Sequence, residues 1–226
     1  MEVSAEVEGS AVVEYQTISK HQLSAKDVVV IDTLFEALRL RDPATAEHSL
    51  AMAYYSYLIA CEFDRENSKL YYLSGLVHDI GKLAMKDDVL KGSKVLAPEE
   101  KEYLKQHVIE GVYILERLKL PELVVQVAKS HHERYDGSGY CEGLAGEDIP
   151  LCGRIAAVAD TYATLIGGRP YAGAVSSSEA LEVMRRESYL FDPDVLEWFI
   201  DFVEGESKYL SYFKTDELKR LPLAAL

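Results

Sequence analysis

The sequence predicts an all-α fold, a bundle of helices around a substantial core. Apolar residues recur at helical spacing in several segments, helix N-terminal signals open most of these segments, and no segment alternates like a strand for long. Apolar residues make up 48% and charged residues 27% of the 226 residues, which is ordinary for a globular protein. A chain of this length suits one domain, with or without extensions.

The first three predicted helices each follow a residue that caps a helix N-terminus. Ser24-Ala25-Lys26-Asp27 resembles a capping box. Asp42-Pro43 joins an N-cap residue to a proline at the first helical position, and Asp64 opens the next segment. We expect these helices over about 25–40, 43–61 and 64–78, with the third ending at His78-Asp79-Ile80-Gly81.

After a short connection, two predicted helices open on a proline, at Pro98-Glu99-Glu100 and at Pro121-Glu122. A glycine-rich loop then covers about 133–150, and loops of this length in a compact domain are usually functional or disordered. The helices expected in this half of the chain cover about 98–118, 121–132, 151–166, 177–187 and 193–203.

Residues 25–203 form the predicted domain. An acidic, weakly patterned N-terminal tail or strap at 1–24 precedes it, and a mixed C-terminal extension at 204–226 follows it. These flanking segments could pack on the core or pair two copies in a homodimer, and the sequence leaves both options open. It also leaves open whether the chain is a fragment of a longer sensor protein.

Charge and cysteine usage narrow the partners and the compartment. The net charge of −14 argues against a nucleic-acid polymer, which requires a basic face, but it allows a small phosphorylated ligand held by cations. Three cysteines without a CxxC motif indicate no disulfide framework. The acidic start lacks the features of a signal peptide, and the longest apolar stretch, around 50–61, is too short to span a membrane. We therefore expect a cytoplasmic protein without a membrane partner.

Histidines in helical segments provide the strongest functional signal. Five of the six histidines lie at or near apolar positions of predicted helices, and only His21 looks incidental. Neutral imidazole is the commonest metal ligand among side chains. Any one of the five alone is better explained as a core histidine, whereas the set together indicates a metal centre assembled from several helices. The five are His48, His78, His107, His131 and His132.

Two carboxylates extend this set. Asp79 directly follows His78, and such an aspartate can bridge two ions. Asp160 lies inside an apolar helix, where an unpaired charge is costly. A buried ion pair of Asp160 with Arg154 or Arg169 is the alternative to metal ligation.

The order and spacing of these residues resemble the HD superfamily of metal-dependent phosphohydrolases, and more narrowly its HD-GYP branch. The resemblance covers about residues 25–203. The matching segments are Arg41-Asp42-Pro43 with His48, then His78–Lys82, His107, His131–Tyr140, Arg154–Asp160, Arg169-Pro170-Tyr171 and Phe191-Asp192-Pro193.

The resemblance implies an HD-domain helical bundle with a dinuclear metal site between helices, and hydrolysis of a cyclic dinucleotide. The expected substrate is cyclic di-GMP, cleaved to the linear dinucleotide or to GMP. The implied cofactors are two divalent ions, iron or manganese, which suit nitrogen and carboxylate ligands. Two cations roughly 3.5–4 Å apart lower the pKa of a bridging water and so supply hydroxide for attack on phosphorus. The implied ligands are His48, His78, Asp79, His107, His131, His132 and Asp160, with Asp79 as the bridge.

The resemblance also implies residues on the substrate side. Lys82 would donate to a non-bridging phosphate oxygen as negative charge builds, so Asp79 and Lys82 are the expected catalytic residues. Arg169 would contact a phosphate or a guanine, while Gly139 and Tyr140 belong to the loop that shapes the substrate entrance. A solvated surface side chain is the alternative for Lys82.

Four positions depart from the family pattern. The Gly-Tyr-Pro triplet appears as Gly139-Tyr140-Cys141, which frees the φ angle of residue 141 and restores its N–H. Ala44 stands where some members bind a third metal through a glutamate, so we expect two metals here. Ala163 replaces a frequent aspartate, and Ala172 replaces a frequent basic residue.

Two other functions compete with a cyclic-dinucleotide phosphodiesterase. One is an HD phosphohydrolase that acts on another nucleotide, which the loop 136–140 disfavours because that loop belongs to the narrower branch. The other is a metal-containing regulatory module that binds a nucleotide or a partner signalling protein without turnover. Cys141 and Ala172 motivate this second alternative.

Overall fold

The computed structural model describes residues 23–90, 97–168 and 173–206, and all regular secondary structure in these ranges is helical. The prediction of an all-α fold is therefore confirmed. The predicted tail, 1–24, and the predicted extension, 204–226, lie almost entirely outside the described ranges. None of the helices in the described residues combines the length and the apolarity that a bilayer crossing requires.

The first two helices begin where their capping residues predict. Helix α1 (Ala25–Arg41) opens with a reciprocal capping box, in which the Ser24 hydroxyl accepts from the Asp27 N–H and the Asp27 carboxylate accepts from the Ser24 N–H. Helix α2 (Pro43–Phe63) starts at the proline, and the Asp42 carboxylate accepts from the Thr45 N–H. The side-chain caps satisfy backbone donors that have no partner within the helix.

The third helix differs from the prediction at its start. Asp64 precedes a short 3₁₀ turn, η1 (Arg65–Asn67), and α3 (Ser68–Val77) begins after that turn. The Asp64 carboxylate accepts from the Asn67 side-chain amide at 2.9 Å and from the Tyr71 hydroxyl at 3.1 Å. These side-chain bonds close the turn and link it to α3, so the aspartate stabilises a turn rather than the first turn of an α-helix.

The remaining elements agree with the expected ranges, apart from shifts of a few residues at some ends. The connection after α3 contains η2 (Ile80–Ala84) and the short helix α4 (Asp87–Leu90). The other elements are α5 (Pro98–Arg117), α6 (Glu122–Ser130), η3 (Gly146–Asp148), α7 (Leu151–Gly167), α8 (Ser177–Arg186), η4 (Ser188–Leu190) and α9 (Pro193–Glu206).

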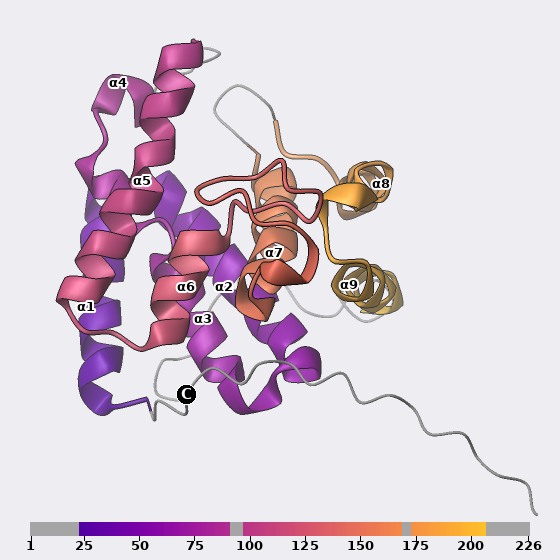
Figure 1. The fold of residues 1–226 in the computed structure, drawn as a ribbon, viewed down its shortest axis with the longest axis horizontal. Helices are drawn as coiled ribbons and strands as arrows, with labels where there is room; N and C mark the ends of the chain where they lie inside the picture. The colour runs from indigo at the N-terminus through magenta and orange to yellow at the C-terminus, as the bar shows by residue number, and fades with distance from the viewer. Residues whose placement is uncertain (1–22, 91–96, 169–172, 207–226) are drawn as a thin grey trace, which may run out of the picture.

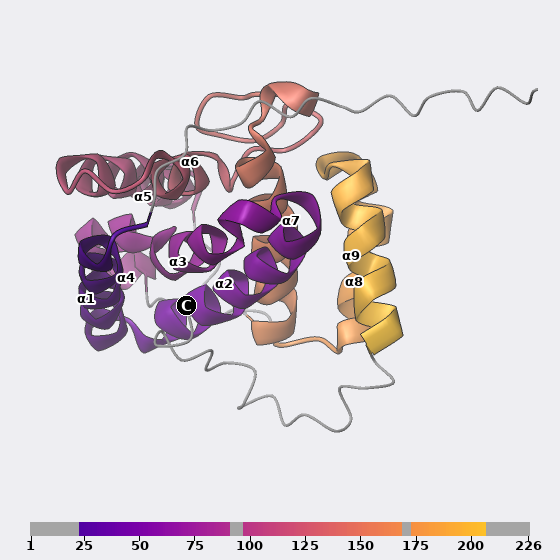
Figure 2. The same cartoon turned by 90° about the horizontal axis from the view of Figure 1, so that it is seen from below.

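Helices α2, α3 and α7 form the centre of the bundle. Helix α2 contacts both α3 and α7, and α6 contacts α3, α5 and α7 (Figure 1). Helix α1 lies on one side of this centre, and α8 and α9 lie on the other, against α7 (Figure 2). Nine of the ten residues of α3 are buried, so this helix is the innermost element near the start of the chain.

A glycine allows the close crossing of α2 and α3. A Cβ atom added to Gly75 would lie 2.4 Å from the Ala53 Cα and 2.9 Å from the Ala53 Cβ. Only a residue without a side chain fits at that separation. Because His48 lies on α2 and His78 directly follows α3, this crossing brings their rings to a centroid distance of 5.4 Å.

A buried ion pair joins α7 to the start of α9. The Arg154 guanidinium contacts the Asp192 carboxylate and donates through Nε to the Ile149 carbonyl at 3.0 Å. Asp192 also accepts from the backbone N–H groups of Asp194 and Val195, and so caps α9. Arg154 thereby pairs with Asp192, and in the part of the chain that the structure describes Asp160 pairs with His48 and His78.

We expect Gly75→Ala to lower the free energy of unfolding by about 1–3 kcal/mol, because the added methyl group overpacks the crossing of α2 and α3. Urea denaturation followed by circular dichroism measures this change. The control is Gly167→Ala, at an exposed helical glycine where an added Cβ meets nothing within 4 Å. That substitution should be neutral or slightly stabilising. Equal effects of the two substitutions would contradict the close-crossing argument.

Candidate metal centre

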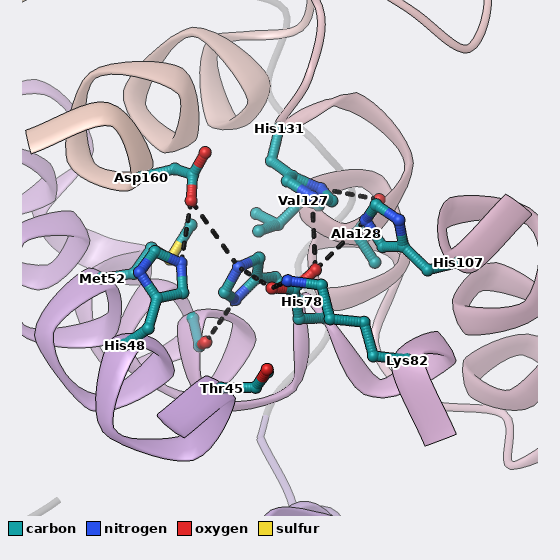
Figure 3. Close-up of polar contacts among 12 residues, drawn as sticks. Thr45, His48, Met52, His78, Lys82, His107, Val127, Ala128, His131 and Asp160 are labelled. Carbon is teal, nitrogen blue, oxygen red and sulfur yellow. Dashed lines mark hydrogen bonds and ion pairs between the residues drawn. The ribbon is translucent and has the colours of Figure 1, made fainter. Parts of the chain in front are cut away.

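The seven residues predicted as metal ligands lie together where five helices meet. His48 comes from α2, His107 from α5 and Asp160 from α7. His78 caps the C-terminus of α3 and is followed by Asp79, while His131 caps the C-terminus of α6 and is followed by His132. Figure 3 shows the labelled ligands from these helices turned toward a common centre.

The ligand atoms form three groups that overlap. Within each group the candidate ligand atoms all lie within 4.8 Å of one another. The groups are His48, His78 and Asp160, then His78, Asp79 and His131, and finally His107, His131 and His132. Shared members make the three groups one continuous site, long enough for more than one ion.

Asp79 lies in the middle of this site. Its Oδ1 atom is 3.1 Å from His107 Nε2 and 3.9 Å from His131 Nε2. Its Oδ2 atom is 3.3 Å from His78 Nε2. One carboxylate thus faces histidines of both halves of the site, as a bridging ligand requires.

The backbone fixes the orientation of three imidazole rings. The Nδ1 atom of each ring lies within hydrogen-bond distance of the carbonyl oxygen three residues earlier: 2.8 Å for His78, 2.6 Å for His107 and 2.9 Å for His131. A carbonyl oxygen can only accept, so Nδ1 carries the proton and Nε2 of the neutral ring presents a lone pair. These three Nε2 atoms and Asp79 Oδ1 are buried without a hydrogen-bond partner.

Such an arrangement fits a cation. Imidazole lone pairs and a carboxylate oxygen that face one another at 3–4 Å repel unless a positive charge lies between them. Each buried polar atom without a partner also costs about 1–3 kcal/mol. Nitrogen and carboxylate donors suit first-row divalent metals, so the residues present fit the metal ions that the sequence predicts.

The electrostatics favour charged carboxylates and mostly neutral imidazoles. Burial disfavours the Asp79 anion, but the nearby Lys82 and His78 hold its pKa well below the ordinary range. Burial also opposes the Asp160 anion, and His48 at 2.9 Å keeps the pKa of that carboxyl well below its usual value. Among the imidazoles, burial lowers the pKa of His131 to about 3 and that of His132 well below the ordinary value.

His78 differs from these two rings. Burial opposes its protonation, but the Asp79 carboxylate beside it raises the pKa of His78 above the ordinary value. A metal ion at His78 Nε2 would take the place of that proton.

A second glycine positions the His-Asp pair against α5. A Cβ atom on Gly81 would lie 1.9 Å from the His107 carbonyl oxygen and 2.5 Å from the Gly111 nitrogen. The turn η2 therefore presses directly on α5, which places Asp79 beside His107. Without a glycine at position 81, the two ligands could not come this close.

His131 and His132 are adjacent in sequence, yet both rings lie at the site because they stand at the end of α6. Their ring centroids are 4.0 Å apart, and the His132 ring lies 5.2 Å from that of His107. The Tyr140 ring packs against His132 at 4.6 Å, which brings the glycine-rich loop to the edge of the metal centre.

A cavity of about 570 Å³ lies beside the ligands. His132, Tyr140 and Asp160 line it from the metal centre, and Arg134 lines it from the loop. On the side of α8 and α9 its lining residues include Val183, Leu190 and Phe191. This volume is within the range of small-molecule sites in proteins.

The predicted substrate-side residues have different surroundings. Lys82 lies at the centre, with its Nζ 2.6 Å from Asp79 Oδ2, and its side chain keeps a 20% exposed fraction. Tyr140 lines the cavity. Gly139 packs on the backbone, since a Cβ there would lie 2.4 Å from the Arg134 nitrogen. Arg169 lies outside the described residues, as does Ala172.

Sequence reasoning missed one buried acidic residue at the site. Glu133 follows the two histidines directly and is 1% exposed. A glutamate at the start of a polar loop is ordinarily solvated, so the pattern gave no reason to expect burial. The available signals were its position next to two predicted ligands and its place in the segment His131–Tyr140 that carries the resemblance.

We expect Mn(II), or Fe(II) under anaerobic conditions, to raise the melting temperature of metal-free protein, because a ligand bound only by the folded state stabilises it by about 2.7 kcal/mol at 100 times its Kd. His107→Ala should abolish most of this shift, and His21→Ala, at the histidine with no predicted role, should retain it. Differential scanning calorimetry with and without metal measures both. A shift that survives in His107→Ala would remove His107 from the ligand set.

Comparison with known families gives a clear match. The model of the HD domain family matches residues 32–195. A cyclic di-GMP phosphodiesterase of Thermotoga maritima is 36% identical over 182 residues, which cover 75% of this chain and 49% of the relative. The response regulator RpfG of Xanthomonas campestris, also named a cyclic di-GMP phosphodiesterase, is 33% identical over 77% of this chain and 48% of the relative. The chain thus spans about half the length of these relatives.

Solved structures share the fold. The cyclic GMP-AMP phosphodiesterase V-cGAP3 of Vibrio cholerae superposes with a TM-score of 0.64 at 22% identity, over 85% of this chain and 52% of that one. The HD-GYP-type protein Bd1817 of Bdellovibrio bacteriovorus superposes with a TM-score of 0.60 at 19% identity, over 79% and 61% of the two chains. Together with the His-Asp pair, the family model and the relatives from T. maritima and X. campestris show that the chain belongs to the HD domain family, in its HD-GYP branch.

Proposed function

We propose that this chain is a metal-dependent phosphodiesterase that hydrolyses a cyclic dinucleotide, with cyclic di-GMP as the expected substrate. The observation that carries the proposal is the central position of Asp79 between two sets of buried imidazole lone pairs. The relatives from T. maritima and X. campestris, both named cyclic di-GMP phosphodiesterases, support the choice of substrate.

The proposed cofactors are two divalent ions, iron or manganese. His48, His78 and Asp160 would hold one ion, and His107, His131 and His132 would hold the other, with Asp79 between them. Ala44, on the exposed side of α2, offers no carboxylate for a third ion, which supports two. When bound, such a pair of cations lowers the pKa of a coordinated water and polarises a phosphoryl oxygen.

Lys82 is proposed to stabilise the phosphate as its charge grows. Its ammonium group contacts Asp79 at 2.6 Å, and the side chain keeps a 20% exposed fraction. From there it would donate to a non-bridging phosphate oxygen, an interaction that strengthens as the transition state gains negative charge. The carboxylate of Asp79 would hold the ammonium group in place before the substrate arrives.

The cavity is the proposed site for one nucleotide of the substrate. Tyr140 offers an aromatic face, and Arg134 offers a guanidinium group to a phosphate or a base. Arg169 and Gly139 remain proposed substrate contacts, Arg169 outside the described residues and Gly139 by its place in the loop that carries Tyr140.

A second substrate, 3′3′-cGAMP, is the main alternative. A Vibrio cholerae protein named 3′3′-cGAMP-specific phosphodiesterase 1 is 34% identical to this chain over 171 residues. The two cyclic dinucleotides differ in one base, so the metal centre would treat them alike and the cavity would discriminate. If the protein cleaves neither compound, two alternatives remain. It hydrolyses another nucleotide, or it is a module that binds a partner without turnover.

We expect protein reconstituted anaerobically with Fe(II) or with Mn(II) to convert cyclic di-GMP to the linear dinucleotide or GMP, as measured by liquid chromatography. Cyclic di-GMP, 3′3′-cGAMP and cyclic di-AMP should be compared under the same conditions, with Asp79→Ala as the inactive control. Turnover that persists in Asp79→Ala would come from a contaminant. If the protein binds two ions but hydrolyses none of the three compounds, the result favours the alternative of a binding module without turnover.

We expect Lys82→Met to lower kcat by about 10²–10³, because it removes one donor to the developing charge. The metal content should stay at two ions, since Lys82 is not a ligand. Lys86→Met, four residues further along the chain, is the matched control and should keep the activity of the unmodified protein. An unchanged kcat in Lys82→Met would mean that this lysine only pairs with Asp79.

A further inference from the structure

Glu133 has an unusual environment for a loop carboxylate. The residue is 1% exposed, and it directly follows His131 and His132. Its Oε1 atom accepts from the backbone N–H of Glu142 at 2.7 Å and of Gly143 at 3.2 Å, and its Oε2 atom accepts from Leu144 at 3.1 Å. Three consecutive N–H groups thus converge on one buried carboxylate, and hydrogen bonds to a charged group are the strong ones.

These bonds close the glycine-rich loop onto its own start. The Tyr140 N–H donates to the His132 carbonyl at 3.2 Å, and the Gly146 N–H donates to the Tyr135 carbonyl at 2.8 Å. Gly139 lies so close to Glu133 that a Cβ there would be 2.5 Å from the Glu133 Cα. The segment 139–144 therefore packs against residues 132–134, with Glu133 at the centre of the contact.

The closed loop determines where Tyr140 lies. Its ring packs on His132 at 4.6 Å between centroids, with an interplanar angle of 32°, and the Lys105 ammonium lies 5.2 Å from the same ring. Tyr140 is also part of the cavity wall. A shift of this loop would uncover His132 and change the shape of the cavity at the same time.

We propose that Glu133 is a positioning residue, which holds Tyr140 against His132 and so sets both the cavity wall and the access to the metal centre. The part of this proposal that concerns turnover rests on the proposed activity, whereas the part that concerns metal access rests on the proposed metal site alone. Position 141 gives the carboxylate particular importance in this chain. Cys141 has no ring to restrict its φ angle, so the backbone is held from residue 142 onward by Glu133 instead.

The test is a double-mutant cycle between Glu133→Ala and Tyr140→Ala. If Glu133 acts through Tyr140, the two single substitutions change the Mn(II) release rate and KM by the same factor. The double variant then shows no larger change than either single variant. Glu133→Gln is the graded variant, because its amide oxygen keeps two of the three acceptor contacts and its NH₂ group faces the remaining N–H. The matched control is Glu142→Gln, on the same loop, whose exposed side chain pairs with Lys129.

Four quantities are measured: metal content, the rate at which EDTA removes Mn(II) from the loaded protein, and KM and kcat for cyclic di-GMP. We expect both single Ala variants to retain two ions, to release Mn(II) about 10–100-fold faster and to raise KM by a similar factor with a smaller change in kcat. Glu133→Gln should be intermediate, and Glu142→Gln should match the unmodified protein.

Three results would overturn the proposal. The first is additive effects of the two substitutions in the double variant. The second is a Mn(II) release rate and a KM of Glu133→Ala that equal those of the unmodified protein. The third is loss of the metal ions themselves in both Glu133 variants. If the unmodified protein cleaves no cyclic dinucleotide, the proposed function fails. The Mn(II) release rates of the same variants then still decide whether Glu133 acts through Tyr140.

Discussion

The buried carboxylate of Asp79, surrounded by imidazole lone pairs, is the constraint on which the rest of the structure depends. The Asp79 Oδ1 atom and the unprotonated ring nitrogens around it repel one another, and the described residues give these atoms no hydrogen-bond partner. The bundle gathers the predicted ligands from α2, α3, α5, α6 and α7, so the contacts among these helices also set the distances between the predicted ligand atoms. Helix packing and the proposed metal binding would therefore be linked, because the same crossings determine both.

Two close backbone approaches bring the predicted metal ligands of this bundle together. Gly75 lets α2 and α3 cross near His48 and His78, and Gly81 lets the turn after α3 touch α5 at His107. The break between α3 and η2 matters equally. In a continuous helix, neighbouring residues point about 100° apart. Since α3 ends at Val77, Asp79 leaves the helical path and faces the same centre as His78.

Much of the fold could be read from local chemistry. Capping residues and prolines marked the starts of α1, α2 and α5, and the predicted ligand series named residues that the fold brings together. Sequence could not reveal features that depend on side-chain reach across the bundle. The role of Asp64 in a 3₁₀ turn, the pairing of Arg154 with Asp192 and the burial of Glu133 are of this kind. Each depends on partners that only the folded chain brings near.

The hydrogen bonds at the Nδ1 atoms also affect how the site tolerates mutation. His78, His107 and His131 are each oriented by the main-chain carbonyl three residues earlier, and no substitution can delete a carbonyl. The orientation of the three rings is therefore set by the backbone and not by a neighbouring side chain, which a mutation could replace. A side chain that only lines the cavity can therefore change without turning these three rings, so the cavity can acquire new substrate preferences while the orientation of the rings is kept.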